Sequence, residues 1–226
     1  MRVWQTDLRR SDEWIEDAVA SVLAAGESER RGRESHHVWR RRVVARAALR
    51  VALGRYLDRP PGSLELALGP GGKPRLAGAA DRDEVFFSLS RNADLCLIAI
   101  CEEGPVGVDV EEVRDVPELA DLVRSRFAAS EAMAILERSG EERLRAFYRC
   151  WTRKEACVKA LGTGIGAGLG SVVVSVGDRA ALLAAPGTRA GEWSLLDLVP
   201  GEGFAGALAV RGAAAEDPGP PIRLKF

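Results

Sequence analysis

The 226-residue chain contains two successive series of predicted elements, and each series begins with helices and ends with strands. Helical spacing of apolar side chains and strand-like alternation, separated by Gly and Pro turns, define these elements. The predicted helices cover residues 11–25, 34–57, 117–124, 130–138 and 141–161, and the predicted strands cover 64–68, 85–90, 94–101, 106–111, 171–176, 192–198 and 204–210. This order predicts an α+β protein with two halves of similar size, residues 1–104 and 105–226.

Composition and charge restrict the classes of protein to which the chain can belong. A hydrophobic fraction of 46% is enough to fill a core, and a net charge of −1 argues against a general nucleic-acid or membrane-surface binder. The N-terminus is polar within a few residues, and no apolar run approaches the ~20 residues of a membrane span. The cysteines have no C-x-x-C spacing. We therefore expect a soluble, cytoplasmic protein with reduced thiols and a loose tail at residues 217–221.

Asp109 and Glu111 lie in the predicted strand Gly-Val-Asp-Val-Glu, residues 107–111. Side chains alternate between the two faces of a strand, so the two carboxylates share one face while Val108 and Val110 point into a core. Neighbouring carboxylates repel each other unless a cation lies between them, and oxygen ligands of this kind suit Mg²⁺. Taken alone, the pattern is equally compatible with an exposed acidic strand face.

The predicted helix at 141–161 contains Trp-Thr-Arg-Lys-Glu-Ala-Cys-Val-Lys-Ala at residues 151–160. Glu155 and Lys159 are one helical turn apart and share a face, and Lys154 precedes Glu155. An isolated Glu-Lys pair at this spacing is more often a solvated surface pair than part of a site.

Cationic residues gather in two further places. The turn Gly71-Gly72-Lys73-Pro74 allows close backbone approach and presents the Lys73 charge to a phosphate or nucleotide. The helix at 34–57 and the segment before it are rich in arginine, and a few of these side chains would contact a phosphate-rich ligand while most are solvated. The loose dinucleotide-binding pattern at residues 162–167 follows a helix and precedes a strand, which is the reverse of the required order, so we assign it no cofactor.

In order, G-K-P at residues 72–74, F-S-x-S at 87–90, G-V-D-V-E at 107–111 and W-T-x-K-E-A-x-x-K-A at 151–160 form a set that resembles the Sfp-type 4′-phosphopantetheinyl transferases. This family activates carrier proteins of peptide, polyketide and fatty-acid synthases. The resemblance implies a pseudo-dimer of two similar α+β halves with the active site at their interface. It also implies that Asp109, Glu111 and Glu155 hold Mg²⁺, which Mn²⁺ could replace, against the pyrophosphate of coenzyme A.

The same resemblance implies a set of residues around coenzyme A, with lysines at its phosphates and arginines of the basic helix near its 3′-phosphate. The implied set is Arg30, Arg33, Arg41, Arg46, Lys73, Pro74, Ser88, Leu89, Asp109, Lys154 and Lys159. One departure concerns the family's usual S-H-S, which is Ser88-Leu89-Ser90 in this chain. The phosphate contact of that histidine is therefore missing, and either Arg91 supplies a substitute charge or the affinity for coenzyme A is lower.

The implied activity is that of a holo-[acyl-carrier-protein] synthase. In this Mg²⁺-dependent reaction, a serine of an acyl or peptidyl carrier protein attacks coenzyme A and adenosine 3′,5′-bisphosphate leaves. Glu155 would accept the serine proton and Lys159 would stabilise the leaving phosphate. Coenzyme A and a carrier protein are the implied partners, without nucleic acid or membrane, and a monomer is expected.

Two alternatives compete with this interpretation. The first is a catalytically silent module of the same fold that binds coenzyme A or a carrier protein, and Leu89 is its only support. The second is a nucleic-acid binder built on the arginine-rich helix, which leaves the three acids unexplained.

Overall fold

The computed structural model describes residues 1–29, 32, 34–69, 72–77, 85–162, 169–212 and 218–225. The helices are α1 (Asp12–Ser21), α2 (His36–Leu57), α3 (Leu119–Arg126), α4 (Ala129–Leu136) and α5 (Gly140–Leu161), with 3₁₀ turns at Pro61–Ser63, Leu169–Ser171 and Ala190–Glu192. The strands are β1 (Arg2–Asp7), β2 (Leu66–Leu68), β3 (Pro74–Leu76), β4 (Phe86–Asn92), β5 (Leu95–Cys101), β6 (Val106–Glu112), β7 (Val173–Val174), β8 (Leu182–Ala184), β9 (Trp193–Leu198), β10 (Phe204–Arg211) and β11 (Ile222–Arg223). The predicted α+β class is confirmed.

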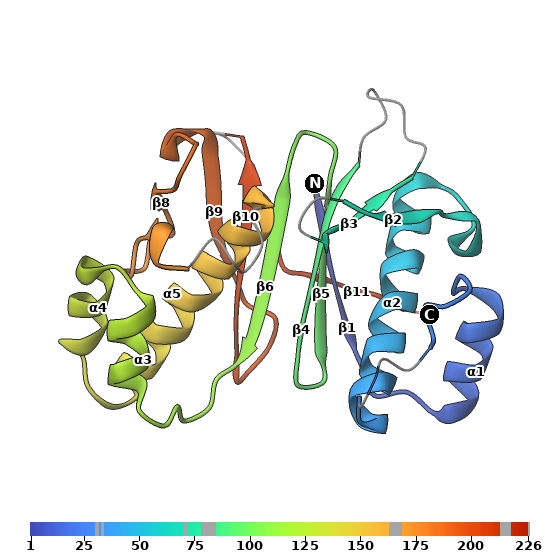
Figure 1. The fold of residues 1–226 in the computed structure, drawn as a ribbon, viewed down its shortest axis with the longest axis horizontal. Helices are drawn as coiled ribbons and strands as arrows, with labels where there is room; N and C mark the ends of the chain where they lie inside the picture. Colours follow the sequence, from blue (N-terminus) through green and yellow to red (C-terminus); the bar gives the residue numbers. More distant parts are fainter. Residues whose placement is uncertain are drawn as a thin grey trace.

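Two sheets pack against each other in the centre of the molecule, and a long helix covers the outer side of each (Figure 1). The first sheet has the strand order β11-β1-β5-β4 and the second has the order β6-β10-β9. Apolar side chains of both sheets, such as Leu97 and Val108, form the core between them. Helix α2 packs on the first sheet and α5 on the second. This helix, sheet, sheet, helix layering is the two-part architecture that the resemblance implies.

Helix α2 shows why its boundaries fall where they do. Ser35 precedes the helix, and its hydroxyl accepts a hydrogen bond from the Val38 backbone N–H at 3.3 Å. Such a cap satisfies one of the N–H groups that the first turn leaves without a helical partner. The helix ends at Asp58, which adopts the left-handed conformation just before the proline pair at residues 60 and 61.

Strand β6 packs unusually close to α5. Its valines at 108 and 110 are fully buried between the sheets, as the alternation predicts, so the intervening side chains face the helix. A Cβ at Gly107 would lie 2.0 Å from the Ala156 carbonyl oxygen and 2.5 Å from the Ala160 backbone nitrogen. Only glycine permits this approach, which brings the carboxylates of β6 beside α5.

The terminal strands were missed by the sequence analysis, and the residues that follow the predicted loose tail at 217–221 are part of the fold. β1 lies in the interior of the first sheet, where it pairs antiparallel with β5, and β11 pairs parallel with β1. Leu224 is 4% exposed in the core under α2, so burial holds the end of the chain in place. Two predicted strands are shorter than expected because only Leu66–Leu68 and Val173–Val174 pair. In the described part of the chain no helix is long and apolar enough to cross a membrane.

Candidate active site

A cavity of about 630 Å³ opens between α2, β4 and α5, so both halves of the chain line it. Seven residues of the predicted coenzyme A and catalytic set line it together: Arg46, Lys73, Pro74, Ser88, Leu89, Glu155 and Lys159. Its apolar wall comes mainly from Ala45, Leu49, Phe87 and Val158. The cavity therefore combines a cationic lining with an apolar surface.

The cations of the cavity come from three elements and from the turn before β3. Arg42 and Arg46 come from α2, Arg91 comes from β4 and Lys159 comes from α5, while Lys73 lies just before β3. Glu155 is the one acid among the described lining residues. Such a cavity attracts a ligand that carries several negative charges, because guanidinium and ammonium groups bind phosphate oxygens well.

Lys73 also connects the two halves directly. Its Nζ donates hydrogen bonds of 2.8 Å to the Val106 carbonyl at the start of β6 and to the Lys159 carbonyl near the end of α5. Burial and the nearby positive charge of Lys159 lower the pKa of Lys73 to about 8. The lysine of the G-K-P motif therefore lines the cavity and ties the β2–β3 hairpin to the second half.

Asp109 is not among the residues that line the cavity, but it pairs with Lys159, which lines it. Lys159 Nζ donates to Asp109 Oδ1 at 2.6 Å, to Ser90 Oγ at 2.8 Å and to the Val108 carbonyl at 3.1 Å. Burial raises the pKa of Asp109, and the ammonium of Lys159 opposes that shift. Lys159 thus compensates a carboxylate that would otherwise be buried without a counter-charge.

The other two predicted acids are close enough to Asp109 to feel its charge. Burial raises the pKa of Glu111 to about 7, and the charges of Asp109 and Glu155 contribute in the same direction. Burial and the Asp109 charge likewise raise the pKa of Glu155. The three carboxylates therefore repel one another, as the pattern on β6 predicts.

The edge strands β4 and β6 belong to different sheets and are connected through side chains at alternate positions of β4. Ser88 Oγ accepts a hydrogen bond from the Val108 N–H at 3.1 Å, and Ser90 Oγ donates to Asp109 Oδ1 at 2.8 Å. Asn92 Nδ2 donates to Glu111 Oε2. We call Ser88, Ser90 and Asn92 the β4 ladder. The first half of the chain thereby holds both carboxylates of β6.

The three carboxylates were tested as ligands of a divalent cation. Within the described ranges, no three Asp, Glu, His or Cys side chains stand in an arrangement ready to hold a metal ion. Asp109 Oδ2, however, is buried and has no hydrogen-bond partner. A buried carboxylate oxygen without a donor, next to two further carboxylates, matches the oxygen donors that Mg²⁺ prefers. The residues fit the cation once Glu111 and Glu155 turn toward that oxygen.

Lys154 is a correction to the sequence analysis, because the structure places it outside the cavity. Its side chain is fully buried, and Nζ donates 2.5 Å hydrogen bonds to Glu131 Oε2 and the Val172 carbonyl. Consecutive residues of a helix lie about 100° apart around its axis, so Lys154 points away from the face that carries Glu155 and Lys159. It fastens α4 and the start of β7 to α5.

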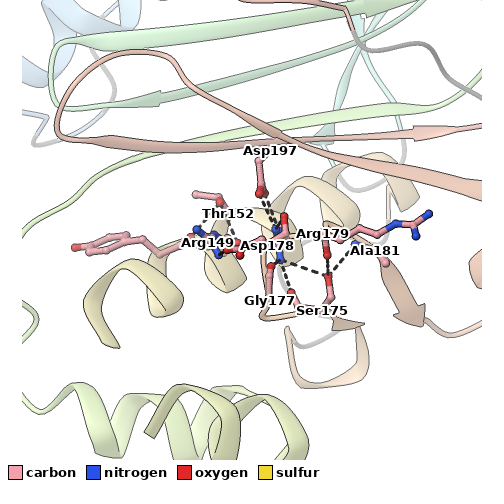
Figure 2. Close-up of polar contacts among 10 residues, drawn as sticks. Arg149, Thr152, Ser175, Gly177, Asp178, Arg179, Ala181 and Asp197 are labelled. Atoms are coloured by element: carbon pink, nitrogen blue, oxygen red, sulfur yellow. Dashed lines mark hydrogen bonds and ion pairs between the residues drawn. The ribbon is translucent and has the colours of Figure 1, made fainter. Parts of the chain in front are cut away.

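Arg153 holds α5 from another side. Its Nε and Nη2 donate to the two oxygens of Asp197 at 2.7 and 2.6 Å, and Nη1 donates to the carbonyls of Ser175 and Gly177. Figure 2 labels the accepting residues Ser175, Gly177 and Asp197, which come from the segment at 175–181 and from strand β9. The Arg-Lys pair of the motif thus supports the helix on which the cavity residues stand.

Several arginines of the basic helix form ion pairs with acidic residues of the protein itself. Arg41 pairs with Asp94 at 2.5 Å and is not among the residues that line the cavity. Arg50 is buried and pairs with Glu27 at 2.6 Å. Arg30 and Arg33 lie outside the described residues. Of the four predicted arginines, the cavity therefore contains Arg46.

The sequence analysis did not assign Ser90 or Asn92 of β4 to the site. It treated Arg42 only as one of the arginines of the basic helix and Arg91 only as a substitute charge. The polar residues at 88, 90 and 92 share one strand face, and this spacing could have indicated a contact with another element. Nothing in the sequence identifies that element as β6.

Three comparisons relate the chain to known proteins. Residues 105–209 match the family model of the 4′-phosphopantetheinyl transferase superfamily. The chain is 32% identical over 215 residues to the 4′-phosphopantetheinyl transferase HetI of Nostoc sp., covering 94% of this chain and 88% of that protein. It is 35% identical over 151 residues to the putative 4′-phosphopantetheinyl transferase slr0495 of Synechocystis sp., covering 67% of this chain and 59% of that protein. The solved holo-[acyl-carrier-protein] synthase of Thermotoga maritima matches 49% of this chain and 64% of its own, at 27% identity and a TM-score of 0.38.

Proposed function

Since this chain belongs to the 4′-phosphopantetheinyl transferase superfamily, we propose that it transfers the 4′-phosphopantetheine group of coenzyme A to a serine of an acyl or peptidyl carrier protein. The observation that carries the proposal is one cavity in which Lys73 and Arg46 of the first half meet Glu155 and Lys159 of the second. A silent module of the same fold would not need a carboxylate beside a lysine in the lining of such a cavity.

Coenzyme A suits the cavity in both charge and shape. The molecule carries a pyrophosphate and a 3′-phosphate together with a flat adenine ring. The cations of the cavity lining match the phosphates, and the apolar wall of Leu49, Phe87 and Leu89 offers a surface to the ring. We assign Arg46, Lys73, Pro74, Ser88, Leu89 and Lys159 to coenzyme A binding.

Glu155 and Lys159 would act on the reacting atoms. The serine oxygen of the carrier forms a bond to the β-phosphorus of coenzyme A, the bond from that phosphorus to the bridging oxygen breaks, and adenosine 3′,5′-bisphosphate leaves. Glu155 would accept the serine proton, and its raised pKa brings it closer to neutral pH, where a general base is most effective. Lys159 Nζ would stabilise negative charge on the departing phosphate.

Asp109, Glu111 and Glu155 are the residues that would hold Mg²⁺, with Mn²⁺ as a replacement. When bound, the cation would neutralise charge on the phosphate oxygens during transfer. The protein's own part is to hold the two carboxylates of β6, Asp109 and Glu111, through the β4 ladder and Lys159, despite the repulsion among the three acids.

The remaining assignments follow from the same proposal. We propose residues 1–104 and 105–226 as the two halves, a monomer as the active unit, and the cytoplasm as its place. We assign no nucleic-acid partner, because Arg41, Arg42 and Arg50 of the basic helix pair with acids of the protein itself.

The intact mass of a carrier protein, measured after incubation with the chain, coenzyme A and Mg²⁺, tests the proposal. We expect a gain of one phosphopantetheine group, which is lost on chelation of Mg²⁺ and in the Asp109→Ala variant. Arg145→Ala is the matched control, because Arg145 is exposed on α5 far from the cavity residues. Absence of any gain with peptide, polyketide and fatty-acid carriers alike would instead favour the silent module.

A further inference from the structure

We propose that Asn92 is a positioning residue for the metal site, because it orients the Glu111 carboxylate from the opposite half of the molecule. The inference rests on the proposed function only in taking Glu111 as a ligand of Mg²⁺. It concerns a residue that none of the sequence motifs contains, at the last position of β4.

The Asn92 amide makes two hydrogen bonds to neighbouring residues of β6. Its Oδ1 accepts from the Glu112 backbone N–H at 3.3 Å, and its Nδ2 donates to Glu111 Oε2. An amide has its acceptor on one side and its donors on the other. Because the backbone N–H fixes the side of the oxygen, the NH₂ group has to face the Glu111 carboxylate. The Glu112 backbone N–H of β6 therefore sets the orientation of the Asn92 amide, and that amide in turn holds the Glu111 carboxylate of the same strand.

Glu111 needs this support more than Asp109 does. Asp109 receives hydrogen bonds from both Lys159 and Ser90, and one of these donors is a cation. Glu111 is repelled by Asp109 and Glu155 and attracted by Lys159, and its hydrogen-bond donors among the described residues are neutral, namely the Asn92 amide and the Trp151 indole. Neutral donors that orient a ligating carboxylate raise metal affinity by pre-arranging the oxygen, and loss of one costs about 10–100-fold in affinity.

The β4 ladder contains its own control for this inference. Ser88 also joins β4 to β6, but its hydroxyl accepts from the Val108 backbone N–H and touches neither carboxylate. Loss of Ser88 therefore weakens the connection between the strands without releasing a ligand. Comparison of Ser88→Ala with Asn92→Ala separates support of the fold from support of the metal site.

The experiment is a Mn²⁺ titration of the full chain, followed by electron paramagnetic resonance and made without coenzyme A, because Ser88 is itself assigned to coenzyme A binding. We expect Asn92→Ala to weaken Mn²⁺ binding by about 10–100-fold, whereas Ser88→Ala stays within about twofold of the unchanged chain. Thermal unfolding checks that both variants fold. Asn92→Ser is the milder variant, because it keeps a polar side chain at this position of β4 but lacks the amide that donates to Glu111. It should fold and still lose Mn²⁺ affinity.

Each outcome decides between the inference and the proposed function. Unchanged Mn²⁺ affinity in Asn92→Ala and Asn92→Ser, or an equal loss in Ser88→Ala, overturns the role of Asn92 alone. No Mn²⁺ binding by the unchanged chain overturns the metal site and the inference with it. Selective loss in the Asn92 variants, combined with no transfer to any carrier, supports Asn92 and refutes the transferase. In an active protein, Asn92→Ala should raise the Mg²⁺ concentration needed for half-maximal rate and leave the KM for coenzyme A unchanged.

Discussion

Replacing Gly107 with alanine tests whether contact between β6 and α5 positions the active site. The added Cβ would lie 2.0 Å from the Ala156 carbonyl oxygen and 2.5 Å from the Ala160 nitrogen, and both atoms belong to the helix backbone. Non-bonded heavy atoms pack favourably at about 3.5 Å, so the helix and strand have to separate by roughly 1–1.5 Å. Neither partner can turn aside, because neither atom is on a flexible side chain.

The separation should cost both stability and activity. Overpacking a core typically destabilises a protein by about 1–3 kcal/mol, and a backbone clash belongs at the upper end of that range. For a chain of this size, about 3 kcal/mol lowers Tm by roughly 6–12 °C. Displacement of Glu155 and Lys159 by about 1 Å from the carboxylates of β6 should lower kcat about 100-fold.

Calorimetric unfolding and the carrier-protein mass assay measure the two effects of Gly107→Ala. Gly191→Ala is the matched control, because a Cβ there meets nothing within 4 Å and its backbone is not in the left-handed region. We expect the control to change stability by less than about 0.5 kcal/mol. A Gly107→Ala protein that keeps both its Tm and its rate would refute the reasoning, since the close approach would then not determine the geometry of the site.

Three further predictions follow from other contacts. Lys154→Met breaks a fully buried ion pair with Glu131, so it should lower the free energy of unfolding by about 3–5 kcal/mol. The KM for coenzyme A should stay unchanged. A raised KM with unchanged stability would instead show that Lys154 contacts coenzyme A. Arg91→Ala removes an exposed guanidinium of the cavity lining that has no partner among the described residues. It should raise the KM for coenzyme A about tenfold and leave Tm unchanged. Steady-state kinetics and thermal unfolding measure the two effects. Lys73 has a pKa of about 8 in the folded chain, against 10.5 for an unperturbed lysine, so the unfolded chain binds more protons between these two pH values. The Lys73 contribution to stability should therefore rise with pH across that window, by at most about 3 kcal/mol, and denaturant unfolding of Lys73→Met should lack this rise.

The strand and helix that carry the site, β6 and α5, could be predicted because their hydrophobic periodicity is strong. Alternation in β6 placed Val108 and Val110 in the core and left Asp109 and Glu111 on the opposite face, and the structure has this arrangement. The helical period of α5 placed Glu155 and Lys159 on one face, where both line the cavity. Local periodicity fixes which side chains share a face, so the composition of each face could be predicted from the sequence.

The errors arise where a contact with a distant segment decides the outcome. β1 and β11 are strands because they pair with β5 and with each other, and neither short segment shows a pattern that predicts this. Lys154 was grouped with Glu155 because they are neighbours in sequence, but its partner is Glu131, 23 positions earlier. The contact of Asn92 with Glu111 depends on how the two sheets meet, which no local pattern encodes.

The β4 ladder has a consequence for how such a chain could arise and be re-engineered. Strands that pair through their backbones are joined by hydrogen bonds that most substitutions leave unchanged. Each hydrogen bond of the β4 ladder instead depends on one side chain of β4. The contact between β4 and β6 can therefore be changed by single substitutions at positions 88, 90 and 92. Chimaeras that take residues 1–104 from one relative and 105–226 from another should become compatible when positions 88, 90 and 92 are changed to the residues of the relative that supplies β6.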